Sequence, residues 1–301
     1  MAIATFILAA GLGTRLRPLT SFLPKPLLPI GDRPALAHIL DVVRPVALPG
    51  ALVANAHHRA DDLRAFVERS APDLQLSEEA RILGTAGGLR AAGDLLGPGP
   101  VLVWNGDILS TLDVASLVRA HAEEGDAGGT LAVTTLPAGE GNVGTDAHGR
   151  VVRLRQETTA PGEVRGGAFL GVHVVGASTR RALPEEGCLV GDAYLPALRA
   201  GASLRVFEVV DADWHDIGTL ADYEAACLAW LARRGAGAWV GPEARVDDGV
   251  ELRRTIVGRG ARVEGEGLVE RCIVWPDARV TAPCRSSVAT AWGTVSLPPL
   301  R

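Results

Sequence analysis

Ile3-Ala-Thr-Phe-Ile-Leu-Ala-Ala10, followed by Gly11-Leu-Gly-Thr-Arg15, is the stretch that decides the fold of this 301-residue chain. A continuous apolar run that stops at a glycine is typical of a central parallel strand, buried on both faces. A signal peptide is the alternative, but it would begin with basic residues, and the first charged side chain here is Arg15. We therefore expect a buried strand that leads into a glycine-rich loop.

The loop itself has two possible roles. A glycine-rich loop after a parallel strand exposes backbone N–H groups and lets a phosphate approach closely. The spacing does not fit the dinucleotide motif G-x-G-x-x-G, because Leu16 stands at the third glycine position, and no Gly-Lys-Ser/Thr follows as in a Walker loop. On spacing alone, phosphate binding and a plain turn between strand and helix are equally open.

Beyond the loop, strand-like and helix-like segments alternate up to about residue 232. This alternation predicts a mostly parallel sheet with helices on both faces, whose ligands bind at the carboxyl ends of the strands. Residues 140–215 are richer in strands and resemble an inserted antiparallel region. Thr219-Leu-Ala-Asp222 resembles a capping box that opens a helix to about Arg233. The expected helices are 34–43, 61–70, 87–96 and 114–124, and the expected strands are 51–55, 74–76, 100–104, 130–136, 151–154, 168–175 and 204–210.

The tail carries an internal repeat. Val240-Gly-Pro-Glu-Ala-Arg-Val246 recurs, at a constant interval, as Val257-Gly-Arg-Gly-Ala-Arg-Val263 and Val274-Trp-Pro-Asp-Ala-Arg-Val280. A fixed period with apolar β-branched positions predicts a β-solenoid, in which each coil buries its valines against the next. A glycine-rich linker at residues 233–237 predicts a catalytic domain over 1–233 and a repeat domain over 238–301.

Charge and cysteine content limit the possible partners. The net charge is −5, which gives no electrostatic footprint for nucleic acid and argues against a membrane-surface protein. No stretch approaches the roughly 20 apolar residues of a membrane span. The cysteines form no C-x-x-C pair, so we expect buried thiols in a reducing, cytoplasmic compartment. They are Cys188, Cys227, Cys272 and Cys284.

Residues 11–20, together with Leu23-Pro-Lys-Pro-Leu-Leu-Pro29, resemble the N-terminal signature of sugar-1-phosphate nucleotidylyltransferases, also called NDP-sugar pyrophosphorylases. Three later segments are similar to this family as well. They are Leu83-Gly-Thr-Ala-Gly-Gly-Leu89, Asn105-Gly-Asp107 and Trp214-His-Asp-Ile-Gly-Thr219. Many members end in a left-handed β-helix of hexapeptide repeats. The resemblance thus covers the whole chain and implies a Rossmann-like mixed, mostly parallel α/β sheet plus a short left-handed β-helix.

The resemblance also implies a reaction. In this family, a sugar 1-phosphate oxygen attacks the α-phosphate of an NTP, pyrophosphate leaves and an NDP-sugar forms. Arg15 would then hold the triphosphate with its bidentate guanidinium, and Lys25 would lie between the α-phosphate and the sugar phosphate. Asp107 and Asp216 match the family's Mg2+ ligands, and this match favours metal binding over the alternative of an aspartate in a turn or at a helix N-cap.

Further positions match the family's substrate contacts. Glu78 or Glu79 could accept an N–H of the base, although an exposed acidic turn is slightly favoured. Residues 83–89 resemble the stretch whose backbone frames the base. The positions implied for the nucleotide are Leu8, Ala10, Gly11, Gly13, Thr14, Gly84 and Thr85, and those implied for the sugar are Gly144, Gly171 and Asn105.

The chain departs from the family at the sugar phosphate. Many members carry Glu-Lys-Pro after the mid-chain strand, and the lysine holds the phosphate there. This chain has Gln156-Glu157-Thr158 instead. Arg153, Arg155 or Arg165 could replace the lysine, or these arginines could simply lie on an exposed strand face.

Several functional alternatives therefore remain open, and guanylyl transfer to mannose 1-phosphate is the one we favour. Residues 83–89 and the short solenoid favour mannose-1-phosphate guanylyltransferases. Residues 182–188 and the missing lysine favour uridylyl transfer to N-acetylmuramate 1-phosphate, and uridylyl or thymidylyl transfer to glucose 1-phosphate is also open. A non-catalytic regulatory homologue should have lost the phosphate-binding residues, and an acyltransferase would need a histidine in the tail, where none occurs after His215. We expect the tail to join subunits of a homo-oligomer.

Overall fold

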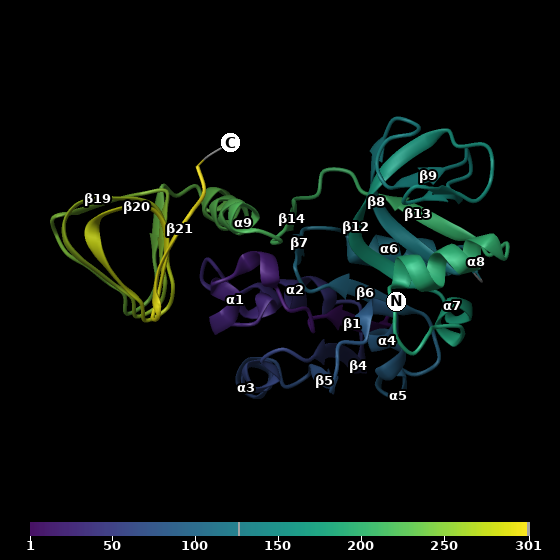
Figure 1. The fold of residues 1–301 in the computed structure, drawn as a ribbon, viewed down its shortest axis with the longest axis horizontal. Coiled ribbons are helices and arrows are strands. Elements are labelled where there is room, and N and C mark those ends of the chain that lie inside the picture. The colour runs from purple at the N-terminus through teal and green to yellow at the C-terminus, as the bar shows by residue number, and fades with distance from the viewer. Residues whose placement is uncertain (126, 300–301) are drawn as a thin grey trace. The chain divides into compact units, whose positions relative to one another are not determined.

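The structure of the protein is a computed structural model that describes residues 1–125 and 127–299 (Figure 1). Internal contacts divide the chain into two units that do not follow the order of the sequence. The first unit comprises Met1–Gly11 and Ile39–Trp214, and the second comprises Leu12–His38 and His215–Arg301. The glycine-rich loop therefore carries the chain out of the first unit between Gly11 and Leu12. The boundary that we predict near residues 233–238 lies inside the second unit and stays a prediction.

A mixed sheet forms the centre of the first unit. Among the described residues it has ten strands, in the order β11-β10-β9-β12-β6-β1-β4-β5, with β8 paired to β12 and to β13. The bounds are β1 Ile3–Leu8, β4 Ala47–Ala56, β5 Gln75–Glu78, β6 Val101–Asn105, β8 Gly129–Leu136, β9 Val143–Thr145, β10 Val151–Leu154, β11 Glu157–Thr158, β12 Arg165–Val175 and β13 Leu204–Glu208.

The opening strand lies in the middle of this sheet, as its continuous apolar run predicts. β1 pairs in parallel with β4 on one side and with β6 on the other. Strands β9 to β12 pair antiparallel, so the predicted sheet with a parallel centre and an antiparallel region is confirmed. Because β1, β4 and β6 run in the same direction, their carboxyl ends reach one edge of the sheet together.

Helices cover the sheet and close its core. One buried cluster joins Phe6, Val53 and Val103 of the sheet to Leu89 of α4 and Tyr194. The helix expected over 87–96 begins earlier, at Gly84, and is interrupted at Ala92. The bounds are α2 Ala35–Val43, α3 Ala60–Ser70, α4 Gly84–Ala91, α5 Gly93–Leu96, α6 Val114–Glu123, α7 Ala177–Arg181, the π-helical segment η3 Leu189–Tyr194 and α8 Leu195–Arg199, with the short strand β7 at Ile108–Ser110.

The second unit joins the N-terminal loop region to the tail. Its long helix α9 (Leu220–Arg233) is preceded by the N-cap Thr219, which forms the predicted capping box with Asp222. The other elements are η1 Thr14–Leu16, α1 Leu19–Phe22, η2 Lys25–Leu27, β2 Pro29–Ile30, β3 Arg33–Pro34, β15 Ala238–Val240, β16 Arg245–Val246, β17 Val250–Arg253, β18 Thr255–Val257, β19 Arg262–Val274, β20 Arg279–Thr290 and β21 Gly293–Ser296. The short strand β14 (Trp214–Asp216) contains the residue at which the first unit ends.

The tail is a stack of parallel coils, as the repeat predicts (Figure 1). Val246 pairs with Val263, and Val263 pairs with Val280, so the constant interval of the sequence repeat is also the register of the coils. The interval becomes shorter later in the last coil, where Ile273 pairs with Val288. β21 then turns back antiparallel along β20. The coils fit the predicted solenoid, and its assignment to the left-handed β-helix class stays a prediction.

Helix α9 holds the second unit together. The Tyr223 hydroxyl donates to the carbonyl of Pro29 at 2.7 Å and accepts from the Trp275 indole N–H at 3.0 Å. The Trp230 ring lies directly against Gly31, whose φ of +65° is in the left-handed region. Segments that are distant in the sequence, near its beginning and near its end, thus share one core.

The cysteines differ from our expectation. Cys227 and Cys272 are buried, but Cys188 and Cys284 are only half-buried. The expectation of four buried thiols is therefore wrong for two of them, and Cys188 becomes relevant below. None of the helices in the described part of the chain is both long and apolar enough to span a bilayer.

Candidate functional site

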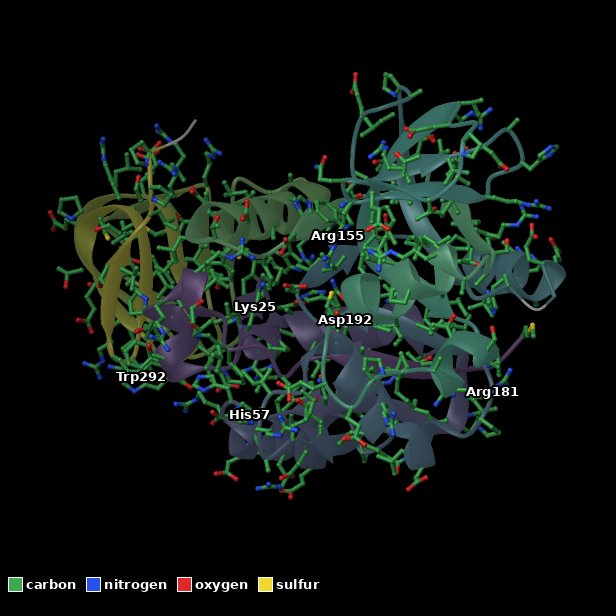
Figure 2. All side chains as sticks on the ribbon, turned by 45° about the vertical axis from the view of Figure 1, so that its right-hand side comes forward. Lys25, His57, Arg155, Arg181, Asp192 and Trp292 are labelled. Carbon is green, nitrogen blue, oxygen red and sulfur yellow. The ribbon has the colours of Figure 1, made fainter. Side chains whose placement is uncertain are left out.

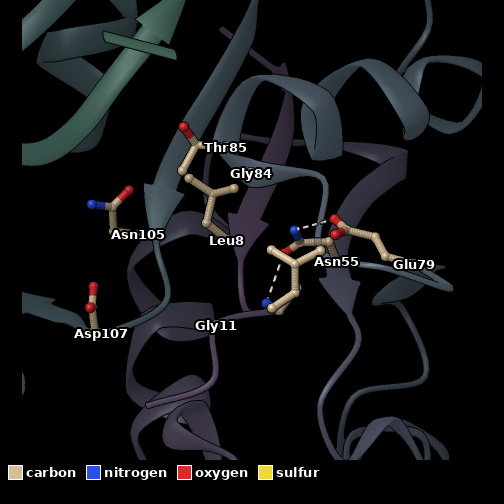
Figure 3. A pocket seen from close by; sticks show the side chains of 10 residues that line it. Leu8, Gly11, Asn55, Glu79, Gly84, Thr85, Asn105 and Asp107 are labelled. Carbon is tan, nitrogen blue, oxygen red and sulfur yellow. Dashed lines mark hydrogen bonds between the residues drawn. The ribbon is translucent and has the colours of Figure 1, made fainter. Parts of the chain in front are cut away.

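A pocket of about 260 Å3 opens at the carboxyl ends of the parallel strands of the first unit (Figure 3). This is the edge where a ligand is expected in an open α/β sheet. Asn55 and Glu79 lie on one side of the pocket, and Asn105 and Asp107 lie on the other. The lining residues are Leu8, Ala10, Gly11, Asn55, Glu79, Ile82, Gly84, Thr85, Asn105 and Asp107.

Asn55 fixes the loop that follows β1. Its side-chain oxygen accepts from the backbone N–H groups of Ala9 at 2.6 Å and Ala10 at 3.1 Å. Its amide nitrogen donates to Glu79 Oε1 at 2.7 Å. Asn55 is 3% exposed, so these bonds are shielded from water. A buried side chain with several bonds of this kind makes the carboxyl ends of β1 and β4 a rigid wall of the pocket.

Glu79 is buried rather than exposed, so the favoured interpretation of an acidic turn is wrong for this residue. Its Oε1 accepts from Asn55, and its Oε2 accepts from the backbone N–H of Leu83 at 3.0 Å. Glu78, in contrast, is exposed and pairs with Arg64 on α3. Because both Glu79 oxygens are bonded within the protein, its first role is to join β4 to the start of α4.

The glycines of the Gly84-Thr-Ala-Gly-Gly88 segment allow α4 to begin close to other chain segments. A Cβ on Gly88 would lie 2.6 Å from Glu79 Oε1, and a Cβ on Gly87 would lie 2.5 Å from the Glu185 carbonyl oxygen. Gly84 has a φ of +74°, and its missing Cβ leaves room for the backbone of Gly187. The segment that precedes Cys188 therefore rests on the first turn of α4.

The opposite wall follows β6. Gly106 donates to the Leu8 carbonyl at 2.9 Å, so the ends of β1 and β6 are tied together immediately before Asp107. Gly171 has a φ of +75°, and a Cβ there would lie 2.8 Å from Asn105 Nδ2. Gly171 thus lies next to Asn105. Gly144 lies under the Glu163 carboxylate, which occupies the space that a side chain at position 144 would take.

A second group of predicted residues meets in the second unit. Lys25 Nζ lies 3.9 Å from Asp216 Oδ1, and Lys25 is 12% exposed. A Cβ on Gly218 would lie 3.2 Å from an Arg15 guanidinium nitrogen and 3.3 Å from Asp216 Oδ1. Gly218 therefore leaves room for both Arg15 and Asp216. We call Arg15, Lys25 and Asp216 the charged cluster.

The turn that presents Arg15 depends on Gly13. This residue has a φ of +61° and caps η1. Its carbonyl accepts from the Thr20 hydroxyl at 2.8 Å, and a Cβ on Gly13 would lie 2.7 Å from Thr20 Cγ2. Only glycine fits this tight left-handed position without strain. Gly13 therefore directs the chain of Thr14 and Arg15 after it leaves the sheet.

The structure thus divides the predicted residues between two places. The positions implied for the nucleotide line the pocket of the first unit, except Gly13 and Thr14, which lie in the turn of the second unit. Asp107 belongs to the pocket, and the charged cluster belongs to the second unit. Sequence reasoning did not identify Asn55 as part of the site. Its place at the end of an expected parallel strand was the available signal.

The donor set is compatible with magnesium. No group of three or more His, Cys, Asp or Glu side chains arranged for a metal is found in residues 1–125 and 127–299. Mg2+ does not require such a cage, because it usually binds one or two carboxylates together with water and substrate phosphates. Asp107, at the carboxyl edge of the sheet, is a suitable carboxylate of this kind.

Comparison with known proteins shows the protein family to which this chain belongs. Residues 4–232 match the nucleotidyl transferase family. The chain belongs to this family, which confirms the resemblance and the prediction of an enzyme. Two relatives and one solved structure are similar to this chain.

Mannose-1-phosphate guanylyltransferase of Mycobacterium tuberculosis is 30% identical over 298 residues, covering 92% of this chain and 81% of the relative. The bifunctional protein GlmU of Paraburkholderia xenovorans is 33% identical over 80% of this chain, and the match spans 56% of that relative. The crystal structure of HddC from Yersinia pseudotuberculosis superposes with a TM-score of 0.60 at 22% identity, over 75% of this chain and 98% of HddC, and shows a shared fold.

Proposed function

We propose that this protein transfers a nucleotidyl group from an NTP to a sugar 1-phosphate, releasing pyrophosphate and forming an NDP-sugar. The observation that carries the proposal is the charged cluster in a chain of the nucleotidyl transferase family. Two anionic substrates must approach each other in this reaction, so the site needs fixed cations. Arg15 and Lys25 supply them, while the pocket with Asn55 receives the nucleoside.

Each residue of the cluster has a proposed task. Arg15 binds the leaving phosphates with two parallel N–H donors. Lys25 binds between the α-phosphate and the incoming sugar phosphate, and Pro24 and Pro26 restrict the backbone on either side of it. The ion pair with Asp216 keeps the Lys25 ammonium oriented before substrate binds.

Asp107 and Asp216 are the residues that would hold Mg2+. Bound with the nucleotide, the ion would neutralise part of the phosphate charge. We expect Asp107→Asn to lower turnover by orders of magnitude, because a neutral amide binds Mg2+ much more weakly than a carboxylate and the ion that offsets the phosphate charge would be lost. Circular dichroism should show an intact fold, and wild-type turnover in Asp107→Asn would contradict the metal assignment.

GTP and mannose 1-phosphate are the proposed substrates. The similarity to a mannose-1-phosphate guanylyltransferase over 92% of the chain favours this pair. Uridylyl transfer to N-acetylmuramate or glucose 1-phosphate, and thymidylyl transfer to glucose 1-phosphate, are the alternatives that the sequence leaves open. A matrix of NTPs against sugar 1-phosphates, scored by pyrophosphate release with and without Mg2+, tests all of these.

The outcome of the matrix decides between two classes of protein. Pyrophosphate release that needs an NTP, a sugar 1-phosphate and Mg2+ together supports the enzyme. Binding of a sugar nucleotide without any release would instead identify a regulatory homologue.

The coil stack is proposed to join subunits. Within the described residues, β15, β16 and β17 each pair with a single neighbouring strand, so the first coil has an open edge. Strand edges of this kind are usually covered by another chain or element. We expect removal of residues 240–301 to change the sedimentation coefficient beyond the effect of mass, and an unchanged oligomer size would contradict the assembly role.

A further inference from the structure

The sugar-phosphate lysine that this chain lacks has three possible replacements, and the structure separates them. The Arg153 guanidinium already has its partners within the protein. It forms a bidentate pair with Glu163 at 2.9 Å and also donates to backbone carbonyls. It is 12% exposed, so it does not lie on an exposed face. Arg165 pairs with Glu208 at 2.7 Å, so its charge is already compensated by a carboxylate.

Arg155 differs from the other two. Among residues 1–125 and 127–299, no carboxylate lies within ion-pair distance of its guanidinium. It follows β10 with a φ of +56°, and its backbone N–H donates to the Asn142 carbonyl at 2.7 Å. Its side chain ends on the thiol of Cys188, with an Nη2 to Sγ distance of 3.1 Å. A neutral thiol is a weak acceptor for a full positive charge.

The segment around Cys188 is built to receive that guanidinium. The Cys188 N–H donates to Asp192 Oδ2 at 2.7 Å, which holds the start of η3. Arg155 and Asp192 are labelled in Figure 2. Gly191 has no side chain, and a Cβ there would lie 3.2 Å from Arg155 Nη1. The space beside the guanidinium is therefore kept open by a glycine.

Several donors converge on the Cys188 sulfur. Burial alone would raise the pKa of this thiol, but the N–H groups of Gly191 and Val190, the charge of Arg155 and the Thr85 hydroxyl together lower the pKa below its usual value. Such convergent donors stabilise any negative charge placed there. The surroundings of the Cys188 sulfur therefore favour the binding of an anion.

This place adjoins the nucleotide pocket. The Leu189 N–H donates to Thr85 Oγ1 at 2.7 Å, and Thr85 lines the pocket. Arg155 follows β10, which is separated from β6 by β9 and β12 in the sheet. A group bound at Arg155 therefore lies on the side of the pocket away from Asn55 and Glu79.

We infer that Arg155 binds an oxyanion of the sugar substrate, beside Cys188 and Thr85, and so replaces the lysine that this chain lacks. The inference rests on the proposed function. The oxyanion is the 1-phosphate common to all candidate sugars, or a carboxylate where the sugar carries one.

Steady-state kinetics of Arg155→Met test the inference. Loss of a charge-assisted hydrogen bond should raise KM for the sugar 1-phosphate about tenfold or more and leave KM for the NTP within about twofold. Arg155→Lys should restore part of the loss, and Arg165→Met is the matched control that should change neither constant. An unchanged sugar KM in Arg155→Met, or an equal rise in both constants, would overturn the inference.

The choice of sugar distinguishes the two oxyanions. A raised KM for mannose 1-phosphate and for N-acetylmuramate 1-phosphate alike identifies the phosphate. A raised KM for N-acetylmuramate 1-phosphate alone identifies its carboxylate.

Alkylation of Cys188 gives a readout that needs no turnover. Iodoacetamide should modify Cys188 more slowly in Arg155→Met, because the thiolate loses its cation. N-acetylmuramate 1-phosphate, which carries both oxyanions, should protect Cys188 in the wild type and not in Arg155→Met, and protection by mannose 1-phosphate as well would identify the phosphate. If no substrate pair releases pyrophosphate, the proposed function fails, and the protection experiment then decides the role of Arg155 by itself: equal protection, or none in either protein, overturns it.

Discussion

Asn55 and Glu79 form a buried hydrogen-bonded pair of 2.7 Å at the carboxyl edge of the sheet, and through this pair three chain segments are held at the pocket. Asn55 binds the end of β1, and Glu79 binds the start of α4. Both Glu79 oxygens and both ends of the Asn55 amide take part in these bonds. The pocket wall is therefore preorganised before a nucleotide enters.

The first prediction concerns this pair. Asn55→Ala leaves the N–H groups of Ala9 and Ala10 and one Glu79 oxygen without their partner. We expect a loss of about 2–4 kcal/mol in the free energy of unfolding, and a raised KM for the nucleotide. Urea denaturation and initial rates measure the two effects. Gln156→Ala, an exposed amide, is the control, and equal stability of the two variants would contradict the role of Asn55.

The second prediction concerns Gly31. Alanine at this position would combine a left-handed backbone with a collision against the Trp230 ring. We expect Gly31→Ala to lower the free energy of unfolding by more than about 3 kcal/mol. Gly50→Ala is a matched control, because Gly50 has a φ of +79° but no atom within 4 Å of the added Cβ. Gly50→Ala should lower the free energy of unfolding by only about 1 kcal/mol. Similar losses in both variants would show that the Trp230 contact is unimportant.

The third prediction concerns the ion pair between helix α9 and the coils. Arg271 donates two hydrogen bonds of 2.8 Å to Glu224, and the side chains are 12% and 6% exposed. Glu224→Gln leaves the Arg271 charge poorly compensated. We therefore expect the free energy of unfolding, measured by chemical denaturation, to fall by about 3 kcal/mol. The exposed pair of Arg253 with Glu251 is the comparison, and Glu251→Gln should cost less than about 1 kcal/mol. A negligible effect of Glu224→Gln would mean that the pair does not stabilise the second unit.

The fourth prediction concerns pH. Burial lowers the pKa of His173 to about 3, and burial also lowers the pKa of His121. The unfolded chain therefore binds protons below about pH 6.5 that the folded chain does not, so stability falls as pH falls. His173 alone contributes up to about 1.4 kcal/mol per pH unit in this range.

Unfolding free energies between pH 6.5 and 4.5 measure this slope, above the range where carboxylates dominate. His173→Gln should reduce the slope, because the amide does not titrate. Tyr194→Phe removes the hydroxyl that hydrogen-bonds His173 but keeps the histidine buried, so the wild-type slope should remain. The same slope in His173→Gln as in the wild type would contradict the prediction.

Some site residues could be predicted from local sequence, and others could not. Gly13, Arg15 and Lys25 stand in one contiguous motif, and Asp107 follows a strand whose apolar pattern is evident. Asn55 with Glu79 and Arg155 with Cys188 are each joined only by folding, because the partners are far apart in the chain. No local pattern distinguishes a buried Glu79 from its exposed neighbour Glu78.

By itself, the sequence determined the direction of the central strands, the cap of α9 at Thr219 and the register in which Val246, Val263 and Val280 stack in successive coils. These features depend on residues that are close in the chain or that repeat at a fixed interval, so periodicity and turn chemistry reveal them. Only the tertiary structure decided that residues 12–38 pack with the tail, and that Arg155, of three similar arginines, ends on a thiol rather than a carboxylate. The reason is that burial and charge compensation depend on which distant side chains share a space.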